Sequence, residues 1–286
     1  MSSLSGRVEP AFEQHGRGGP PLVLLHGLAN SRAVWREVLP ALAADRVVLA
    51  YDHRGHGDSP HLGRADAYTL DALGADLAGL LQARGMTRVD LAGHSLGGTV
   101  ALRFTLRRPE LVRSLILVEP VTRAPGDLPR AVADRLLARA GTEGMAGIAA
   151  LLDRIADFAP RPRSPARRRR LRDSVARMDP AAFAGLTAAL ESLPAMDDAL
   201  RALDVATSVI CGDDPAARSR AGHLERTMPR TVVRIVPGAG HAPHEDDPAG
   251  WLAAVHAHFA DLRREGPEHG QNPDRQRVQR GPSRAR

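Results

Sequence analysis

The sequence Gly93-His94-Ser95-Leu96-Gly97-Gly98 follows an apolar run, Arg88–Gly93, and precedes a helical pattern, Gly97–Arg107, that Pro109 ends. The apolar run is typical of a strand buried on both faces of a parallel sheet. Glycines on both sides of Ser95 favour a strand-to-helix turn so tight that larger side chains would clash. Because of this context, we interpret the turn as one that presents the Ser95 hydroxyl as a nucleophile, rather than as a glycine-rich turn with an incidental serine.

The rest of the chain repeats this alternation of strand and helix. Runs rich in Val, Leu and Ile predict strands at Pro21–His26, Val47–Asp52, Ser114–Glu119, Thr207–Gly212 and Val232–Pro237. Periodic apolar positions predict helices at Val34–Ala43, Leu70–Arg84 and Pro248 to about Arg264. Such repetition is typical of an α/β fold, so the sequence predicts a mostly parallel, doubly wound sheet with helices on both faces.

The alternation stops between Thr122 and Arg201, where the sequence shows no convincing strand. This segment predicts four amphipathic helices, at Pro129–Ala140, Glu143–Ile155, Ala166–Met178 and Pro180–Leu193. We expect an all-helical lid whose two ends lie at the edge of the sheet where Ser95 emerges. The predicted organisation is a core in two parts (1–121 and 202–264), a helical cap (122–201) and a disordered basic tail (265–286).

A histidine that follows a late strand is the candidate general base. His241 lies in Pro237-Gly-Ala-Gly-His-Ala-Pro-His-Glu, a glycine-rich loop directly after the strand Val232–Pro237. Such a loop can bring an imidazole over the nucleophile. His244 is the competing residue, but it stands where the next helix begins and is expected to point elsewhere.

A carboxylate is needed to orient the imidazole and to stabilise the imidazolium. In chain order it should fall between the nucleophile and the base. The strand that ends at Gly212 is followed by Asp213 and Asp214. We favour Asp214 and keep Asp213 as the alternative, the other carboxylate being solvated or capping the next helix. Glu119, at the end of the preceding strand, is a third candidate, although a locally paired carboxylate is the simpler interpretation of it.

Hydrolytic chemistry also needs N–H donors for the oxyanion of the tetrahedral intermediate. The backbone N–H of Leu96, at the start of the helix, is one candidate. The other is the backbone N–H of Leu28, because His26-Gly27-Leu28 lets the chain bend inward after its strand. A simple strand-ending turn is the alternative interpretation of His26-Gly27.

Charge and composition narrow the class of protein. The chain has 286 residues, a net charge of +6 and no lysine, so all 39 basic residues are arginine. Arginines concentrate in Arg161–Arg172 and in the tail from Arg263, and the remainder is net negative. Since the positive charge is local and no aromatic platform accompanies it, the run Arg167–Arg170 is interpreted as a solvated helix face, and nucleic-acid binding is not favoured.

Compartment and cofactors follow from what the sequence lacks. No apolar run is long enough to span a membrane, and no secretion signal is recognised. A single cysteine, Cys211, permits no internal disulfide, which favours the cytoplasm. We expect neither a cofactor nor a metal. A zinc site built from His53, His56 and His61, or from His241 and His244, is not favoured, because no metal-binding motif contains these histidines.

Four strings in order resemble the α/β-hydrolase superfamily. They are HGLANS (His26–Ser31), YDHRGHGDS (Tyr51–Ser59), GHSLGG (Gly93–Gly98) and PGAGHAPHED (Pro237–Asp246), and the match reaches from Pro20 to Phe259 apart from the helical insertion. The resemblance implies the α/β-hydrolase fold and a serine hydrolase similar to esterases and enol-lactonases. It implies a structural role for Asp52, Arg54 and Ser59. The family's acid usually stands three residues after the glycine that Gly212 resembles, which is Pro215 here, and a one-residue deletion would leave Asp214.

The same resemblance excludes several branches of the superfamily. Haloalkane dehalogenases and epoxide hydrolases need aspartate at Ser95, and similar hydroxynitrile lyases need a lysine. C–C bond hydrolases carry an aromatic residue where Ala242 stands, and proline iminopeptidases carry tryptophan at Leu96. The expected activity is cleavage of a small-molecule carboxylic ester, lactone or thioester through an acyl-enzyme on Ser95. An acyl-transfer or cyclisation enzyme and a non-catalytic ligand-binding homologue remain the alternatives.

Overall fold

The computed structural model describes residues 7–122, 138, 142–152 and 164–264. Within them, seven strands form one sheet in the order β1-β3-β2-β4-β5-β6-β7. β1 pairs antiparallel with β3, and the other pairs are parallel. The strands are β1 (Phe12–His15), β2 (Leu22–Leu25), β3 (Val48–Tyr51), β4 (Val89–His94), β5 (Val112–Val118), β6 (Ala206–Cys211) and β7 (Thr231–Ile235). The predicted mostly parallel sheet is confirmed.

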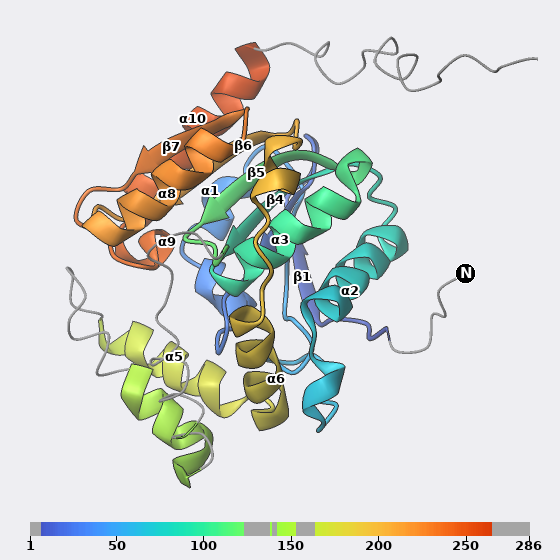
Figure 1. Ribbon diagram of the computed structural model, residues 1–286, viewed down its shortest axis with the longest axis vertical. Coiled ribbons are helices and arrows are strands. Elements are labelled where there is room, and N and C mark those ends of the chain that lie inside the picture. Colours follow the sequence, from blue (N-terminus) through green and yellow to red (C-terminus); the bar gives the residue numbers. More distant parts are fainter. Residues whose placement is uncertain (1–6, 123–137, 139–141, 153–163, 265–286) are drawn as a thin grey trace, which may run out of the picture.

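Helices cover both faces of this sheet (Figure 1). The helices on one face are α2 (Leu70–Ala83), α3 (Leu96–Arg107) and α8 (Pro215–Thr227), and the other face carries the short helices η1 (Arg32–Trp35) and α1 (Leu39–Leu42) and the long α10 (Pro248–Arg264). Neighbouring residues of one strand enter different apolar clusters: Leu25 packs with the α2 and α3 side, and Leu24 with the side of Trp35 and Trp251. Alternation of side chains along a strand produces these two cores, as a doubly wound fold requires.

The predicted strands of the core are confirmed, with ends that differ by one or two residues. The predicted helix Val34–Ala43 is instead split into η1 and α1, because Pro40 near the start of α1 lacks the N–H that a continuous helix would use. Strand β1 was not predicted. It is a half-exposed edge strand with the sequence Phe-Glu-Gln-His, so it carries little of the apolar pattern that marks a buried strand.

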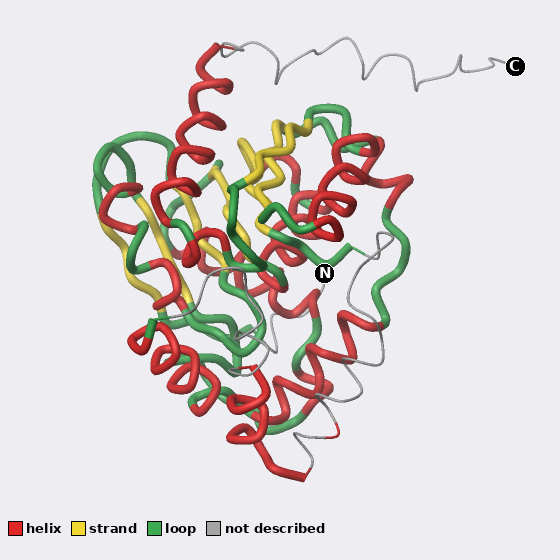
Figure 2. Tube along the Cα trace, turned by 90° about the vertical axis from the view of Figure 1, so that its left-hand side faces the viewer, coloured by secondary structure: helices red, strands yellow, loops and turns green. Residues whose placement is uncertain are grey.

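The helical insertion, residues 122–201, joins β5 to β6. Residues 142–152 are helical, and α5 (Pro165–Ala176), α6 (Pro180–Glu191) and the unpredicted α7 (Asp197–Arg201) follow. The predicted helix Pro129–Ala140, apart from Ala138, and the end of Glu143–Ile155 lie outside the described residues. Figures 1 and 2 show α5 and α6 at the lower end of the molecule, opposite the C-terminal end of α10.

The two ends of the insertion do not lie at the same edge of the sheet, contrary to the prediction. Because β5 and β6 are parallel, the chain must return from the carboxyl end of one strand to the amino end of the next. The segment from Leu193 to Val205, which includes α7, makes this crossing up the molecule (Figure 1). Only the start of the insertion therefore lies beside Ser95 by virtue of the sheet.

The insertion packs closely on the core through α6. A Cβ atom added at Gly185 would lie 2.3 Å from the carbonyl oxygen of Ala65, in the short helix η2 (Ala65–Ala67). Phe183 and Leu186 are fully buried in the apolar cluster of the α2 and α3 side. Asp179 caps α6 and also accepts hydrogen bonds from Gly63 N–H and the Tyr68 hydroxyl. Through these residues the insertion packs on the core.

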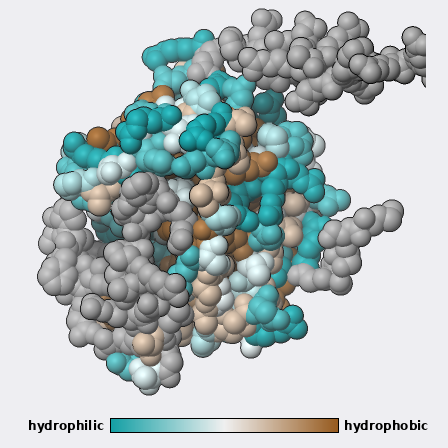
Figure 3. Space-filling view, viewed as in Figure 1, coloured by the Kyte–Doolittle hydropathy of each residue, from teal (hydrophilic) through white to brown (hydrophobic). Residues whose placement is uncertain are grey.

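No helix in the described part of the chain is long and apolar enough to cross a membrane. The surface over α8 is mostly hydrophilic (Figure 3). This agrees with the sequence of that helix, whose apolar contacts to the core come from Ala217, Ala221 and Leu224.

Candidate active site

Ser95 stands between the end of β4 and the start of α3 with an unusual backbone. Its φ of 50° and ψ of −115° are sparsely populated for a residue with a side chain, so the surrounding structure must hold it there. The Ser95 N–H donates to the carbonyl of Val118 on β5 at 2.9 Å, and Thr99 N–H donates to the Ser95 carbonyl at 3.0 Å. The predicted strand–turn–helix context of Ser95 is confirmed.

The glycines around Ser95 are required by close backbone contacts. A Cβ atom at Gly97 would lie 2.3 Å from the carbonyl oxygen of Leu25, and one at Gly93 would lie 2.4 Å from the carbonyl oxygen of Gly97. Both distances are far below van der Waals contact, so helix α3 could not approach β2 and β4 this closely with alanine at either position.

The loop after β2 lies directly against the serine. A Cβ atom at Gly27 would lie 3.4 Å from the Ser95 Cβ and 2.9 Å from His94 Nδ1. Ala29, two residues on, has a φ of 59°, so the loop turns sharply here. The candidate oxyanion donor Leu28 therefore belongs to a loop beside Ser95. Leu96 is the first residue of α3, where a backbone N–H has no acceptor within the helix.

His241 faces Glu119, and not either of the aspartates after β6. Its Nδ1 lies 3.7 Å from Glu119 Oε2, within the loose range seen for such pairs before substrate binds. The His241 side chain is 57% exposed and that of Glu119 is 1% exposed. The imidazole therefore has one buried anionic partner and an accessible edge.

Glu119 is held by two further donors. Gly212 N–H donates to Oε1 at 3.1 Å, and Arg220 of α8 donates to Oε2 at 2.7 Å. Burial favours the neutral acid, but hydrogen bonds and charge from His241 and Arg220 outweigh it and lower the pKa of Glu119 below its usual value. Glu119 is therefore ionised at neutral pH.

The structure places Asp214 away from the role predicted for it. Asp214 is the N-cap of α8, and its Oδ1 accepts from the N–H groups of Ala216 and Ala217, each at 3.0 Å. Asp213 Oδ2 accepts from Gly238 N–H at 2.8 Å and so braces the loop that leads to His241. Among the described residues, no ion pair or hydrogen bond joins His241 to either aspartate. A carboxylate that already caps a helix is directed along that helix, which is the physical reason for the difference.

A signal for Glu119 was present in the sequence. Glu119 directly follows β5, and β5 pairs in parallel with β4, whose end carries Ser95. Carboxyl ends of adjacent parallel strands meet at one edge, so this carboxylate had to emerge next to the serine. Its φ of 48° marks it as a second strained residue at this edge.

His94 and His244 support the loop of His241. His94 Nε2–H donates to the His241 carbonyl oxygen at 2.9 Å, and the His94 ring lies 4.7 Å from that of His244. His244 is buried, with its ring 4.3 Å from that of Trp35. Burial holds the pKa values of both His94 and His244 well below 6.5. Since His244 is enclosed, the geometry favours His241 as the base.

The loop from Asp52 to Ser59 has the structural contacts that the family resemblance implies. Asp52 accepts from the backbone N–H groups of Arg32 at 2.7 Å and Asp58 at 3.0 Å, and Ser59 Oγ donates to the Asp52 carbonyl. Arg54 donates from two nitrogens to Asp76 at 2.6 Å each. These hydrogen bonds fix the loop and engage the polar atoms of Asp52, Arg54 and Ser59.

Three buried histidines form a cluster: His26, which follows β2, and His53 and His56 of this loop. His53 N–H donates to His26 Nε2 at 3.0 Å, so the proton of His26 is on Nδ1, which donates to the Gly27 carbonyl at 2.8 Å. In the described part of the chain, no group of three or more His, Cys, Asp or Glu residues is arranged to hold a metal ion. The visible role of His26 is to shape the loop that carries Leu28.

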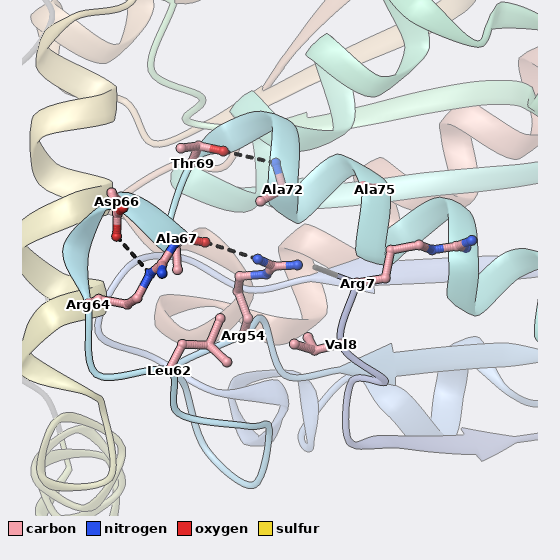
Figure 4. Close-up of a pocket in the computed structure, with 10 residues that line it drawn as sticks. All are labelled: Arg7, Val8, Arg54, Leu62, Arg64, Asp66, Ala67, Thr69, Ala72 and Ala75. Atoms are coloured by element: carbon pink, nitrogen blue, oxygen red, sulfur yellow. Dashed lines mark hydrogen bonds and ion pairs between the residues drawn. The ribbon is translucent and has the colours of Figure 1, made fainter. Parts of the chain in front are cut away.

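A surface groove of about 630 Å³ lies away from these residues. The N-terminal residues Arg7 and Val8, the Arg54 loop, η2 and the start of α2 line it (Figure 4). The Arg54 guanidinium points into the wall and donates to the Ala67 carbonyl at 2.9 Å, and Arg64 pairs with Asp66 at 2.9 Å (Figure 4). Ser95, His241 and Glu119 do not line this groove, so it is not the candidate active site.

Comparison with known proteins identifies the class. A family model described as the alpha/beta hydrolase family matches residues 22–255. The chain belongs to this family, as the four motifs predicted.

Among curated relatives, a protein from Pseudomonas savastanoi named putative carbamate hydrolase RutD is 31% identical over 80% of this chain and 89% of its own length. Other matches are partial. The chain covers 31%, 52% and 40% of the first three relatives, which are the acetyltransferase component of an acetoin cleaving system and two further RutD proteins. A thermophilic esterase from Thermogutta terrifontis has 28% identity and a TM-score of 0.77, over 91% of this chain and 96% of its own. The enol-lactonase from Burkholderia xenovorans, at 23% identity and a TM-score of 0.77 over 88% and 97%, shares the fold.

Proposed function

We propose that this protein is a serine hydrolase whose triad is Ser95, His241 and Glu119. The observation that carries the proposal is the buried, ionised Glu119 facing the exposed imidazole of His241 at the sheet edge where the strained Ser95 emerges. A carboxylate in this position holds the imidazole in one tautomer and stabilises its protonated form. Such a pair activates a serine hydroxyl for attack on a carbonyl carbon.

The proposed reaction proceeds through an acyl-enzyme. His241 takes the proton from Ser95 Oγ as that oxygen bonds to the carbonyl carbon, and the N–H groups of Leu28 and Leu96 stabilise the oxyanion. When the intermediate collapses, the bond to the leaving alcohol, enol or thiol breaks and His241 returns its proton to that group. Water then attacks the acyl-enzyme with His241 as base, which releases the carboxylic acid and free Ser95.

The proposed substrate is a small-molecule ester, lactone or thioester. Support comes from the relatives, because the Thermogutta protein is an esterase and the Burkholderia protein is an enol-lactonase. The RutD name adds carbamates, whose carbonyl is attacked by the same steps.

Covalent labelling tests the proposal. A fluorophosphonate probe should form one adduct, on the tryptic peptide that contains Ser95, and Ser95→Ala should abolish it. Ser192→Ala, at an exposed hydroxyl on the insertion, is the matched control and should label like the wild type. Turnover of p-nitrophenyl acetate should disappear with the label. Full labelling of the Ser95→Ala protein would reject Ser95 as the nucleophile.

A further inference from the structure

Two members of the arginine run on α5, Arg167 and Arg170, do not lie on the solvated face that the sequence predicted. Arg167 is buried, with only 8% of its side chain exposed, and Arg170 is 17% exposed. Arg167 forms ion pairs with Glu245, at 3.3 Å from Nε, and with Asp246. Arg170 reaches Glu37 at 2.7 Å and Glu245 at 3.4 Å. Helix α5 of the insertion is therefore docked by charge onto the core.

Two of the acidic partners, Glu245 and Asp246, lie on α9 (Pro243–Asp246), the short helix that begins two residues after His241. Asp246 uses its two oxygens for different parts of the chain. Oδ1 pairs with Arg167 on the insertion, and Oδ2 accepts from the backbone N–H of Gly240 at 2.8 Å. Gly240 immediately precedes His241, so one buried carboxylate joins the insertion to the loop that carries the candidate base.

Burial makes the Asp246 carboxylate sensitive to the loss of Arg167. The Asp246 side chain is 3% exposed, so water screens its charge little, and the Arg167 guanidinium helps to compensate that charge. When Arg167 is removed, burial of this carboxylate becomes less favourable, and we expect its hydrogen bond with Gly240 N–H to loosen. The His241 side chain is itself 57% exposed, so the position of the imidazole depends on the backbone of its loop, which His94 and Asp213 also contact.

We propose that Arg167 is a positioning residue that holds the His241 loop in its reactive place through Asp246. The inference rests on the proposed function, because it assigns to Arg167 the placement of the base of that same site. Arg167 acts on the rate of the chemical step and not on substrate affinity, since it reaches the loop of His241 only through Asp246 of α9.

The test compares Arg167→Gln with Arg169→Gln, an exposed member of the same run. With an activated ester, Arg167→Gln should lower kcat by about 10- to 100-fold, the cost of a misplacement near 1 Å, and leave KM within about threefold. Arg169→Gln should leave both constants unchanged. Arg167→Lys should recover part of kcat, since an ammonium can pair with Asp246 alone. A change confined to KM, or an unchanged kcat, would overturn the proposal.

Hydrogen exchange supplies a readout that does not depend on catalysis. Arg167→Gln should speed exchange in the peptide spanning Gly238 to Ala242, and Arg169→Gln should not. Since Glu245 and Asp246 lose a partner, Arg167→Gln also lowers stability, so both assays are run well below the melting temperature of the variant. Unchanged exchange in that peptide would refute the link. Failure of Ser95 labelling with the exchange effect intact would instead reject the proposed function and keep the link.

Discussion

Acid should destabilise this protein from about pH 6 downward, because its buried histidines are neutral in the folded state. Burial lowers the pKa of His26 from 6.5 to about 4, and the pKa values of His56 and His258 to about 3. Burial acts in the same direction, with large effect, on His53, His94 and His244. Each of these imidazoles therefore binds its proton at a lower pH in the folded chain than in the unfolded chain.

The sign and size follow from proton binding. Between the folded pKa and 6.5, the unfolded chain binds a proton that the folded chain does not, so stability falls as the pH drops below 6.5 and levels off at the folded pKa. At pH 5, His26, His56 and His258 each remove about 2 kcal/mol from the free energy of unfolding, about 6 kcal/mol together. Typical domains have a total of about 5–15 kcal/mol.

Urea unfolding at pH 7, 6 and 5 measures this loss. The fluorescence of Trp35 and Trp251 suits the assay, because both side chains are fully buried. The free energy of unfolding should fall by several kcal/mol from pH 7 to pH 5, and His258→Gln should flatten the slope by about 1.4 kcal/mol per pH unit, one proton fewer. A free energy that stays within about 1 kcal/mol from pH 7 to pH 5 would refute the reasoning.

Three further substitutions test other parts of the structure. Arg220→Gln should move the acidic limb of the kcat/KM profile to higher pH, because Arg220 helps to keep the pKa of Glu119 low; an unmoved limb would contradict this. Gly97→Ala should cost about 1–3 kcal/mol in urea unfolding, since the new Cβ would lie 2.3 Å from the Leu25 carbonyl, and a wild-type midpoint would show that α3 can shift freely. Phe183→Ala should cost about 3–5 kcal/mol by the same assay, because Phe183 is core; a small loss would make it part of a pocket instead.

The parts of the fold that could be predicted are those with a strong local pattern. Strands β2 to β7 are short apolar runs, and the turn at Ser95 is specified by glycines that its packing requires. The edge strand β1 was missed because half of it faces solvent and its residues alternate poorly.

The candidate orienting acid and the arginine run of α5 show why other contacts could not be predicted from the order of residues in the sequence. Asp214 follows a strand, as an orienting acid should, but the start of α8 needs a cap, and local hydrogen bonds use the carboxylate. The role that we propose for Glu119 depends on the strand that lies beside it in space. A run of arginines indicates solvent until the acidic helix α9, about 75 residues later, folds against it. The sequence therefore predicts which residues reach this edge of the sheet, but tertiary contacts decide which of the charged side chains pair.

The most direct test of the proposed triad compares Glu119→Gln with Asp214→Asn. Turnover of p-nitrophenyl acetate by each variant is measured at pH 7.5, beside the wild type. If Glu119 orients His241, Glu119→Gln should lower kcat by about 10³- to 10⁴-fold, and Asp214→Asn should leave kcat within about threefold. The opposite result, an active Glu119→Gln protein and an inactive Asp214→Asn protein, would contradict the assignment and return the role to Asp214.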